Sequence, residues 1–144
     1  MSDNIIIEAQ GLVKRYGDPS AGSGRGVEAV RGLSFAIRRG EIFGFLGPNG
    51  AGKTTTISML SCLLEPTEGT AIVAGYDVVK APGEVKRRIG LVPQELALYP
   101  TLSARDNLNF YGRIYGLRGR TLRRRVDEVL GMVGLAERAG SAVE

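Results

Sequence analysis

The chain has 144 residues, 43% of them hydrophobic, which is enough for one compact domain with an ordinary core. Its net charge of +4 and pI near 9.5 favour anionic ligands, but the dense basic stripe typical of a nucleic-acid protein is missing. No stretch approaches the ~18 consecutive apolar residues that a membrane-spanning helix needs. Residues 1–4 lack the features of a secretory signal, so we expect a cytoplasmic chain that needs another polypeptide to cross a membrane.

Cysteine and histidine are scarce. Cys62 is the single cysteine, so the sequence excludes an internal disulfide and a multi-cysteine metal site, and no disulfide partner is expected. Because Cys62 lies in an apolar stretch, we expect it to act as a small buried hydrophobic residue. The chain has no histidine, which removes the commonest general base and metal ligand.

The first forty residues have the pattern of strands and turns. Residues 5–7 and 12–13 predict a strand pair that leads to Tyr16, and alternating apolar residues predict a further strand over 27–37. Between them, residues 17–26 are rich in Gly, Ser and Pro, which predicts a solvated loop insertion.

The central part alternates between strand and helix patterns. Residues 42–46 form a short apolar run bounded by glycines, which predicts a strand buried on both faces. Apolar residues then follow at helical spacing over 54–64, where Pro66 closes the helix. Two further strands are predicted over 70–74 and 89–92, separated by a short basic segment.

From Thr101 onward the apolar residues recur at helical spacing. Ser103 and Asp106 have the form of a capping box at the start of one helix. A second helix carries an apolar stripe made of Leu122, Val126, Val129, Leu130 and Val133. The chain is therefore predicted to be mixed α/β to about residue 95 and helical afterwards.

A glycine-rich loop carries the clearest chemical signal. The motif G-x-x-x-x-G-K-[ST] is formed by Gly47, Pro48, Asn49, Gly50, Ala51, Gly52, Lys53 and Thr54. The glycines let backbone N–H groups point at phosphate oxygens, and the following helix presents its positive end to the same anion. Lys53 is placed to reach the β- and γ-phosphates, Thr54 to ligate Mg²⁺, and Thr55 to donate to the α-phosphate. The loop therefore predicts a site for ATP with Mg²⁺.

The same loop has a simpler explanation, a Gly-rich turn before an ordinary helix. A chance match in a chain of this composition has a probability of roughly half a per cent. The simpler explanation also leaves open why the loop follows a predicted buried strand and begins a helix, as phosphate binding requires. We therefore interpret the loop as a phosphate-binding loop.

The segments around the loop narrow the class of protein. GPNGAGKTT at 47–55 follows RGEIFGFL at 39–46, and LVPQE at 91–95 closes a later predicted strand. Together these segments resemble the nucleotide-binding domain of ATP-binding-cassette (ABC) transporters over nearly the whole chain, apart from 17–26. GYDV at 75–78 and LYPTLS at 98–103 are similar to the branch that serves exporters, including drug-resistance pumps.

The resemblance implies a fold and a division of the chain. The fold is α/β: a P-loop NTPase (RecA-like) core with an antiparallel β subdomain over residues 1–95. The start of an α-helical subdomain, incomplete before the signature loop, follows over 96–144.

The resemblance also implies roles for two residues outside the loop. Tyr16 matches the aromatic residue that stacks on adenine, although a tyrosine in this position taken alone would more often fill a gap in the core. Gln94 matches the glutamine that touches Mg²⁺ and the attacking water, and whose loop contacts the membrane subunit. Lys53 and Gln94 are thus the expected catalytic residues, and Thr54 and Gln94 the expected Mg²⁺ ligands.

The family also uses an apolar strand ending in Asp-Glu, a signature loop and a switch histidine, and the sequence has none of them. We therefore expect a truncated chain that binds ATP but does not turn it over, although the family hydrolyses ATP. The resemblance implies an integral-membrane subunit and a second ATP-binding domain as partners, at the inner face of the cell membrane.

Two alternatives remain open at this stage. One is a soluble ABC-type ATPase that acts on nucleic acid or ribosomes, which Arg118, Arg120 and residues 123–125 raise. These arginines fall opposite the apolar stripe, with Asp127 and Glu128 in reach of Arg123 and Arg124, so we expect a solvated helix face and no nucleic acid. The other alternative is a non-catalytic nucleotide-binding fragment.

Overall fold

The computed structural model describes residues 4–17, 27–95 and 97–143, so most of the predicted insertion at 17–26 lies outside the described residues. The chain divides into two compact units, Met1–Leu91 and Val92–Glu144. The division predicted at 95/96, with its two functional subdomains, stays a prediction.

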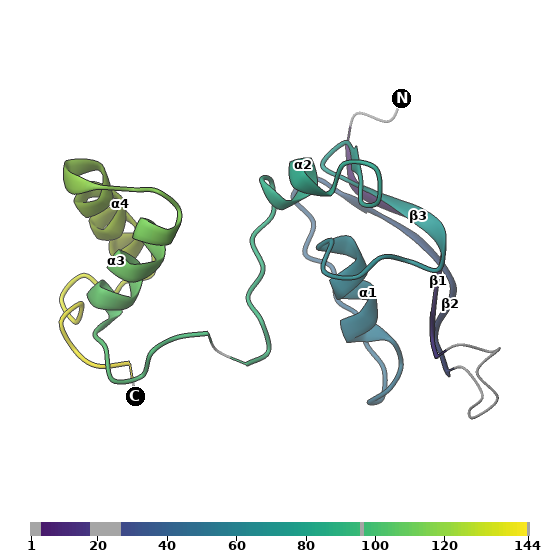
Figure 1. The fold of residues 1–144 in the computed structure, drawn as a ribbon, viewed down its shortest axis with the longest axis horizontal. Coiled ribbons are helices and arrows are strands. Elements are labelled where there is room, and N and C mark those ends of the chain that lie inside the picture. Colours follow the sequence, from purple (N-terminus) through teal and green to yellow (C-terminus); the bar gives the residue numbers. More distant parts are fainter. Residues whose placement is uncertain (1–3, 18–26, 96, 144) are drawn as a thin grey trace. The chain divides into compact units, whose positions relative to one another are not determined.

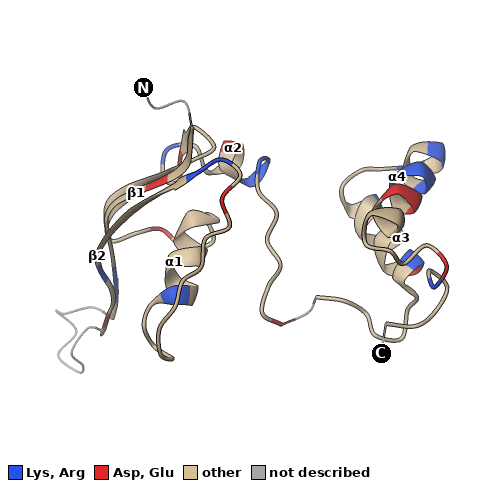
Figure 2. Ribbon diagram, turned by 180° about the vertical axis from the view of Figure 1, so that it is seen from behind, with Lys and Arg blue, Asp and Glu red and all other residues tan. Residues whose placement is uncertain are grey.

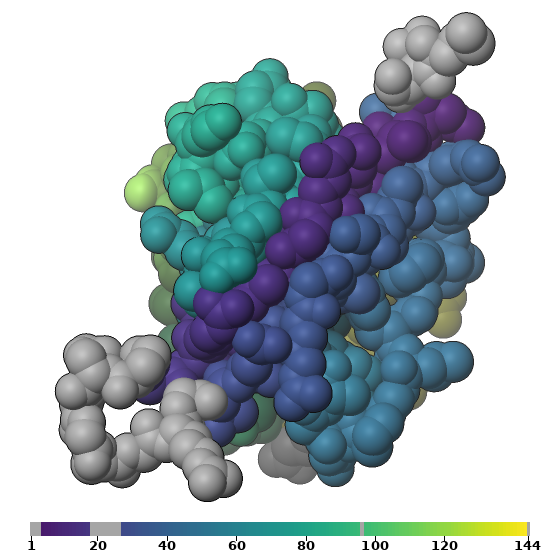
Figure 3. All heavy atoms as spheres, turned by 90° about the vertical axis from the view of Figure 1, so that its right-hand side faces the viewer, coloured from purple at the N-terminus to yellow at the C-terminus, as the bar shows by residue number. Residues whose placement is uncertain are grey.

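In the first unit, the residues that the structure describes form one antiparallel sheet. Its strands are β1 (Ile5–Tyr16), β2 (Val27–Arg38), β3 (Glu68–Val73) and β4 (Tyr76–Asp77), in the order β2-β1-β3-β4. β1 thus lies between β2 and β3, as the space-filling view of this face shows (Figure 3). The arrangement confirms the antiparallel sheet expected from the resemblance.

The predicted strand pair over 5–13 is wrong, because the structure has one continuous strand there. Its pairing shifts register between Ala9 and Leu12, and Gly11 between them has a φ of 57°. The irregularity places both Leu12 and Val13 in the buried layer, which interrupts simple alternation. The apolar residues at 5–7 and 12–13 therefore have the pattern of two strands separated by a turn, although they belong to one strand.

Two short helices lie on the same side of the sheet, α1 (Lys53–Leu60) and α2 (Pro82–Lys86) (Figure 1). They close the core of the first unit. That core consists of the buried residues Ala9, Leu12, Val30, Met59, Leu60, Ala71, Val73, Val78 and Val85. The helix at the glycine-rich loop is therefore anchored by Met59 and Leu60, one to two turns from its start.

Helix α1 ends before Leu64, where the sequence predicted its end. Cys62 has a φ of 57°, and the N–H groups of Leu63 and Leu64 both donate to the carbonyl of Ser58. This left-handed residue turns the chain out of the helix. Cys62 is half-buried beside the core, close to the predicted role, and burial raises the pKa of its thiol.

The strands predicted over 42–46 and 89–92 are not formed. Ile42 and Leu46 are fully exposed, whereas Phe43 and Phe45 pack against Phe35 of β2 with ring centroids 5.4 and 5.3 Å from it. A strand buried on both faces needs neighbours on both edges, and residues 42–46 pair with no strand among the described residues. The predicted burial on both faces is therefore wrong as well, because the described residues supply no neighbouring strand to cover Ile42 and Leu46.

The described residues of the second unit form two helices, α3 (Ala104–Ile114) and α4 (Gly119–Met132). Ser103 is the N-cap of α3, and its Oγ accepts a hydrogen bond from the backbone N–H of Asp106 at 3.1 Å, which confirms the predicted cap. The core consists of Leu122, Val126, Leu130 and Ala139. Val133, predicted on the apolar stripe, is exposed because α4 ends before it.

None of the helices in the described residues is long and apolar enough to cross a membrane.

Candidate phosphate-binding site

The glycine-rich loop, residues 47–54, leads directly into α1 in the first unit. Gly47, Gly50 and Gly52 all have positive φ angles, of 150°, 84° and 80°. A Cβ at Gly52 would lie 2.3 Å from the carbonyl oxygen of Ala29 on β2, and one at Gly47 would lie 3.2 Å from the Cβ of Ala51. The loop therefore needs glycine both for its backbone conformation and for its close approach to β2.

The start of α1 has no side-chain cap. Its N-cap residue is Gly52, and the first turn contains no acidic residue. The first amide of the helix that bonds back is that of Thr56, which donates to the carbonyl of Gly52 at 2.8 Å. The N–H groups before it, together with the positive end of the helix dipole, suit an anion such as phosphate.

Lys53 folds back across this loop. Its Nζ donates to the carbonyl oxygens of Gly47 at 2.6 Å and Pro48 at 2.7 Å. The ammonium group therefore lies at the loop, bound to two of its carbonyl oxygens. Thr54 follows it with an exposed side chain, so its hydroxyl is accessible to a cation.

Thr56 supports the loop, although the sequence analysis did not single it out. Its side chain is buried, and its Oγ1 donates to the carbonyl of Gly52 at 2.9 Å. This bond ties the last glycine of the loop to the end of the first turn of α1. Helical spacing could have predicted the burial of Thr56, because it lies on the same face of the helix as Met59 and Leu60.

Tyr16 lies next to the first turn of α1, although it comes from the far end of β1. Its hydroxyl is 3.5 Å from Oγ1 of Thr55, and its side chain is 44% exposed. The Nζ of Lys14 lies 5.7 Å from the centre of the Tyr16 ring. The fold therefore brings an accessible aromatic ring to the phosphate-binding loop, as an adenine platform would require.

A groove of about 570 Å³ adjoins the loop. It is lined by residues 28–34 of β2 together with Gly50, Ala51 and Thr56. The glycine-rich loop therefore borders a solvent-accessible groove on its side next to β2.

Gln94 belongs to the second unit and is exposed. Its predicted contact with Mg²⁺ and the attacking water stays a prediction. Among residues 4–17, 27–95 and 97–143, no group of three or more acidic, His or Cys side chains forms a metal site.

These observations fit a nucleotide with its metal ion. The loop amides and Lys53 would hold the phosphates, and Thr54 would offer an oxygen ligand of the kind Mg²⁺ prefers. The same arrangement places the Tyr16 hydroxyl 3.5 Å from Oγ1 of Thr55, at the first turn of α1.

Comparisons with characterised proteins agree with this chemistry. The family model described as "ABC transporter" matches residues 30–144. The linearmycin resistance ATP-binding protein LnrL of Bacillus subtilis (strain 168) is 46% identical over 139 residues, which cover 96% of this chain and 42% of that protein. The doxorubicin resistance ATP-binding protein DrrA of Mycobacterium tuberculosis (strain ATCC 25618 / H37Rv) is 42% identical over 129 residues, which cover 90% of this chain and 37% of that protein. The chain thus spans less than half the length of these relatives.

Solved structures show the same fold. The dimeric ATP-binding cassette MJ0796, in a post-hydrolysis state with ADP and Pi, has a TM-score of 0.72 and 27% identity, covering 94% of this chain and 60% of that one. CbiO1 from Clostridium perfringens, part of the ABC transporter complex cbiONQ, has a TM-score of 0.80 and 25% identity, covering 96% of this chain and 54% of that one. They confirm the expected α/β P-loop NTPase fold. The chain therefore belongs to the ABC transporter family.

Proposed function

We propose that this chain binds Mg-ATP as part of an ATP-binding subunit that drives export through a separate membrane subunit. The observation that supports it best is the uncapped start of α1, with Lys53 bound across the loop and Tyr16 beside Thr55. Lys53 and the loop amides bind the phosphates, Thr54 and Gln94 bind Mg²⁺, and Tyr16 stacks on adenine.

The names of the relatives support an export role and the expected partners. LnrL and DrrA are both named as resistance ATP-binding proteins, for linearmycin and doxorubicin. The MJ0796 structure is a dimer, which supports a second ATP-binding domain as a partner. The subunit then acts at the inner face of the cell membrane, attached through the membrane subunit.

The arginines of α4 support nucleic-acid binding less well than they support a solvated helix face. Arg125 pairs with Glu128 at 2.9 Å, and Asp127 pairs with Arg105 of α3 at 2.6 Å. The predicted pairing of these acids with Arg123 and Arg124 is therefore wrong, because Asp127 faces α3 across the helix pair. Figure 2 shows acidic and basic residues together on α4, as on a solvated helix face.

We further propose that residues 1–144 by themselves bind ATP without turning it over. Acceleration needs groups that act on the transition state, chiefly a carboxylate that orients water. Glu28, which lines the groove beside the loop, is engaged by Arg15 at 2.8 Å and by Arg31 at 3.9 Å. Phosphate release from the purified chain should stay at background, with Lys53→Ala as the contamination control. Steady release that this substitution abolishes would contradict the proposal.

Adenine stacking predicts a difference between two substitutions of Tyr16. Tyr16→Ala should weaken ATP binding by ~1–3 kcal/mol, since it removes the ring. Tyr16→Phe keeps the ring and loses only a hydroxyl contact at 3.5 Å, so its affinity should stay close to that of the parent protein. Isothermal titration calorimetry measures both affinities. Equal losses in the two variants would show that the hydroxyl, and not the stack, matters.

A further inference from the structure

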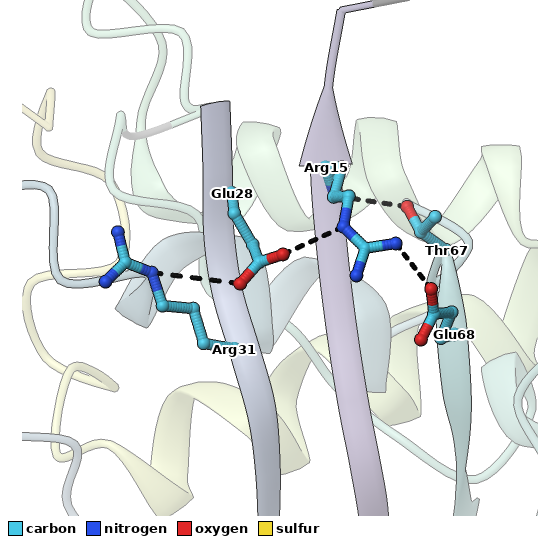
Figure 4. A network of polar contacts seen from close by, with 5 residues as sticks. All are labelled: Arg15, Glu28, Arg31, Thr67 and Glu68. Carbon is cyan, nitrogen blue, oxygen red and sulfur yellow. Dashed lines mark hydrogen bonds and ion pairs between the residues drawn. The ribbon is translucent and has the colours of Figure 1, made fainter. Parts of the chain in front are cut away.

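Arg15 connects three strands at the end of the sheet next to Tyr16. Its Nε donates to Oε2 of Glu28 on β2 at 2.8 Å, and its Nη1 donates to Glu68 on β3. Its backbone N–H donates to Oγ1 of Thr67 at 3.1 Å. Figure 4 shows the guanidinium between the two carboxylates, one on each neighbouring strand.

This bridge positions the strand ends and adds little to the free energy of folding. The side chains of Arg15 and Glu68 are 43% and 57% exposed, and ion pairs this accessible add little to the free energy of folding. The planar guanidinium nevertheless fixes the relative positions of the two carboxylates it joins. The hydrogen bond to Glu28, and then that to Glu68, raises the pKa of Arg15 above its ordinary value.

The bridge lies at a register shift near the end of β1. The pairing of β1 with β2 shifts register between Lys14 and Arg15, and then places Arg15 opposite Glu28 and Tyr16 opposite Val27. Tyr16 is the last residue of the strand and is exposed, with Thr55 and Lys14 beside its side chain. Since successive side chains of a strand point to opposite faces, Arg15 can hold the strand end without covering the Tyr16 ring.

We propose that Arg15 is a positioning residue for nucleotide binding: by bridging Glu28 and Glu68 it holds the end of β1 so that the Tyr16 ring stays beside Thr55. Arg15 itself does not touch the nucleotide. The inference rests on the proposed function, because it requires a base to stack on Tyr16.

The test compares a ligand that has a base with one that has none. Arg15→Gln should weaken Mg-ATP binding by about 3- to 10-fold, less than the loss of the whole stack, and leave binding of Mg-tripolyphosphate unchanged. In the Tyr16→Ala background, Arg15→Gln should have no further effect on ATP binding. Arg15→Lys, which keeps the charge but reaches a single carboxylate, should recover part of the affinity. Arg31→Gln is the matched control, because Arg31 lies 3.9 Å from Glu28 and is 80% exposed.

The outcomes separate the two claims. If the parent protein binds neither ATP nor tripolyphosphate, the proposed function fails, and this inference fails with it. If both ligands bind but Arg15→Gln weakens them equally, Arg15 has a general structural role and the positioning role is wrong. The same conclusion follows if Arg15→Gln weakens ATP binding by the same factor with and without the Tyr16 ring. Circular dichroism of each variant tests whether the fold is kept.

Discussion

Lys53→Ala should lower the affinity for Mg-ATP by roughly 100-fold or more, since charge-assisted hydrogen bonds to phosphate are among the strongest polar contacts. The structure places Nζ of Lys53 within 2.6–2.7 Å of two carbonyl oxygens of the loop, at the point where the phosphates would enter. Because this ammonium binds loop carbonyls and Lys53 is not among the buried core residues, its removal should leave the sheet and the helices folded. Isothermal titration calorimetry with circular dichroism measures both effects.

Lys86→Ala is the control for this substitution. Lys86 is an exposed residue of α2, away from the loop in sequence, so its loss removes a positive charge without touching the phosphate site. The control should bind Mg-ATP as the parent protein does. Unchanged affinity in a folded Lys53→Ala variant would contradict the phosphate-binding role of the loop.

Gly52→Ala should destabilise the first unit and abolish nucleotide binding. The new methyl group would lie 2.3 Å from the carbonyl oxygen of Ala29 and 3.0 Å from Cγ2 of Val30, so β2 or the loop must move. The left-handed φ of 80° adds ~1–2 kcal/mol for a residue with a Cβ. Overpacking against backbone typically costs a further ~1–3 kcal/mol. Denaturant unfolding should therefore show a large loss of stability.

Gly40→Ala separates the two causes of this loss. Gly40 has a φ of 83°, close to that of Gly52, but a Cβ there meets nothing within 4 Å. It should show the conformational cost alone and keep its affinity for Mg-ATP. If Gly52→Ala unfolds no more easily than Gly40→Ala, the close approach of the loop to β2 does not explain the need for glycine at position 52.

The local features of the site could be predicted from the sequence. The spacing of Gly47, Gly52 and Lys53 predicts a loop that begins a helix, and the structure has the helix begin at Lys53. The capping box at Ser103 was equally clear, because a cap depends on residues three positions apart. Such features depend on short stretches of chain, so the residue types within each stretch are enough to predict them.

Features that depend on distant strands could not be predicted in this way. The run at 42–46 has the composition of a buried strand, yet it pairs with no strand among the described residues. The link from Arg15 to Glu28 and Glu68 joins residues that only the sheet order brings together. The contact of Tyr16 with Thr55 was not predicted; the resemblance to a family indicated only that Tyr16 stacks on adenine, and nothing in the spacing requires the contact.

The central claim is that the loop at 47–54 binds Mg-ATP, and amide chemical shifts in the purified protein test it most directly. On titration with Mg-ATP, the largest ¹H–¹⁵N shift changes should fall on the amides of Gly50, Gly52, Lys53 and Thr54 and saturate together. Backbone N–H groups that receive phosphate oxygens change their environment most. Saturation with the largest changes elsewhere in the chain, or no change at millimolar Mg-ATP in a folded protein, would contradict the account.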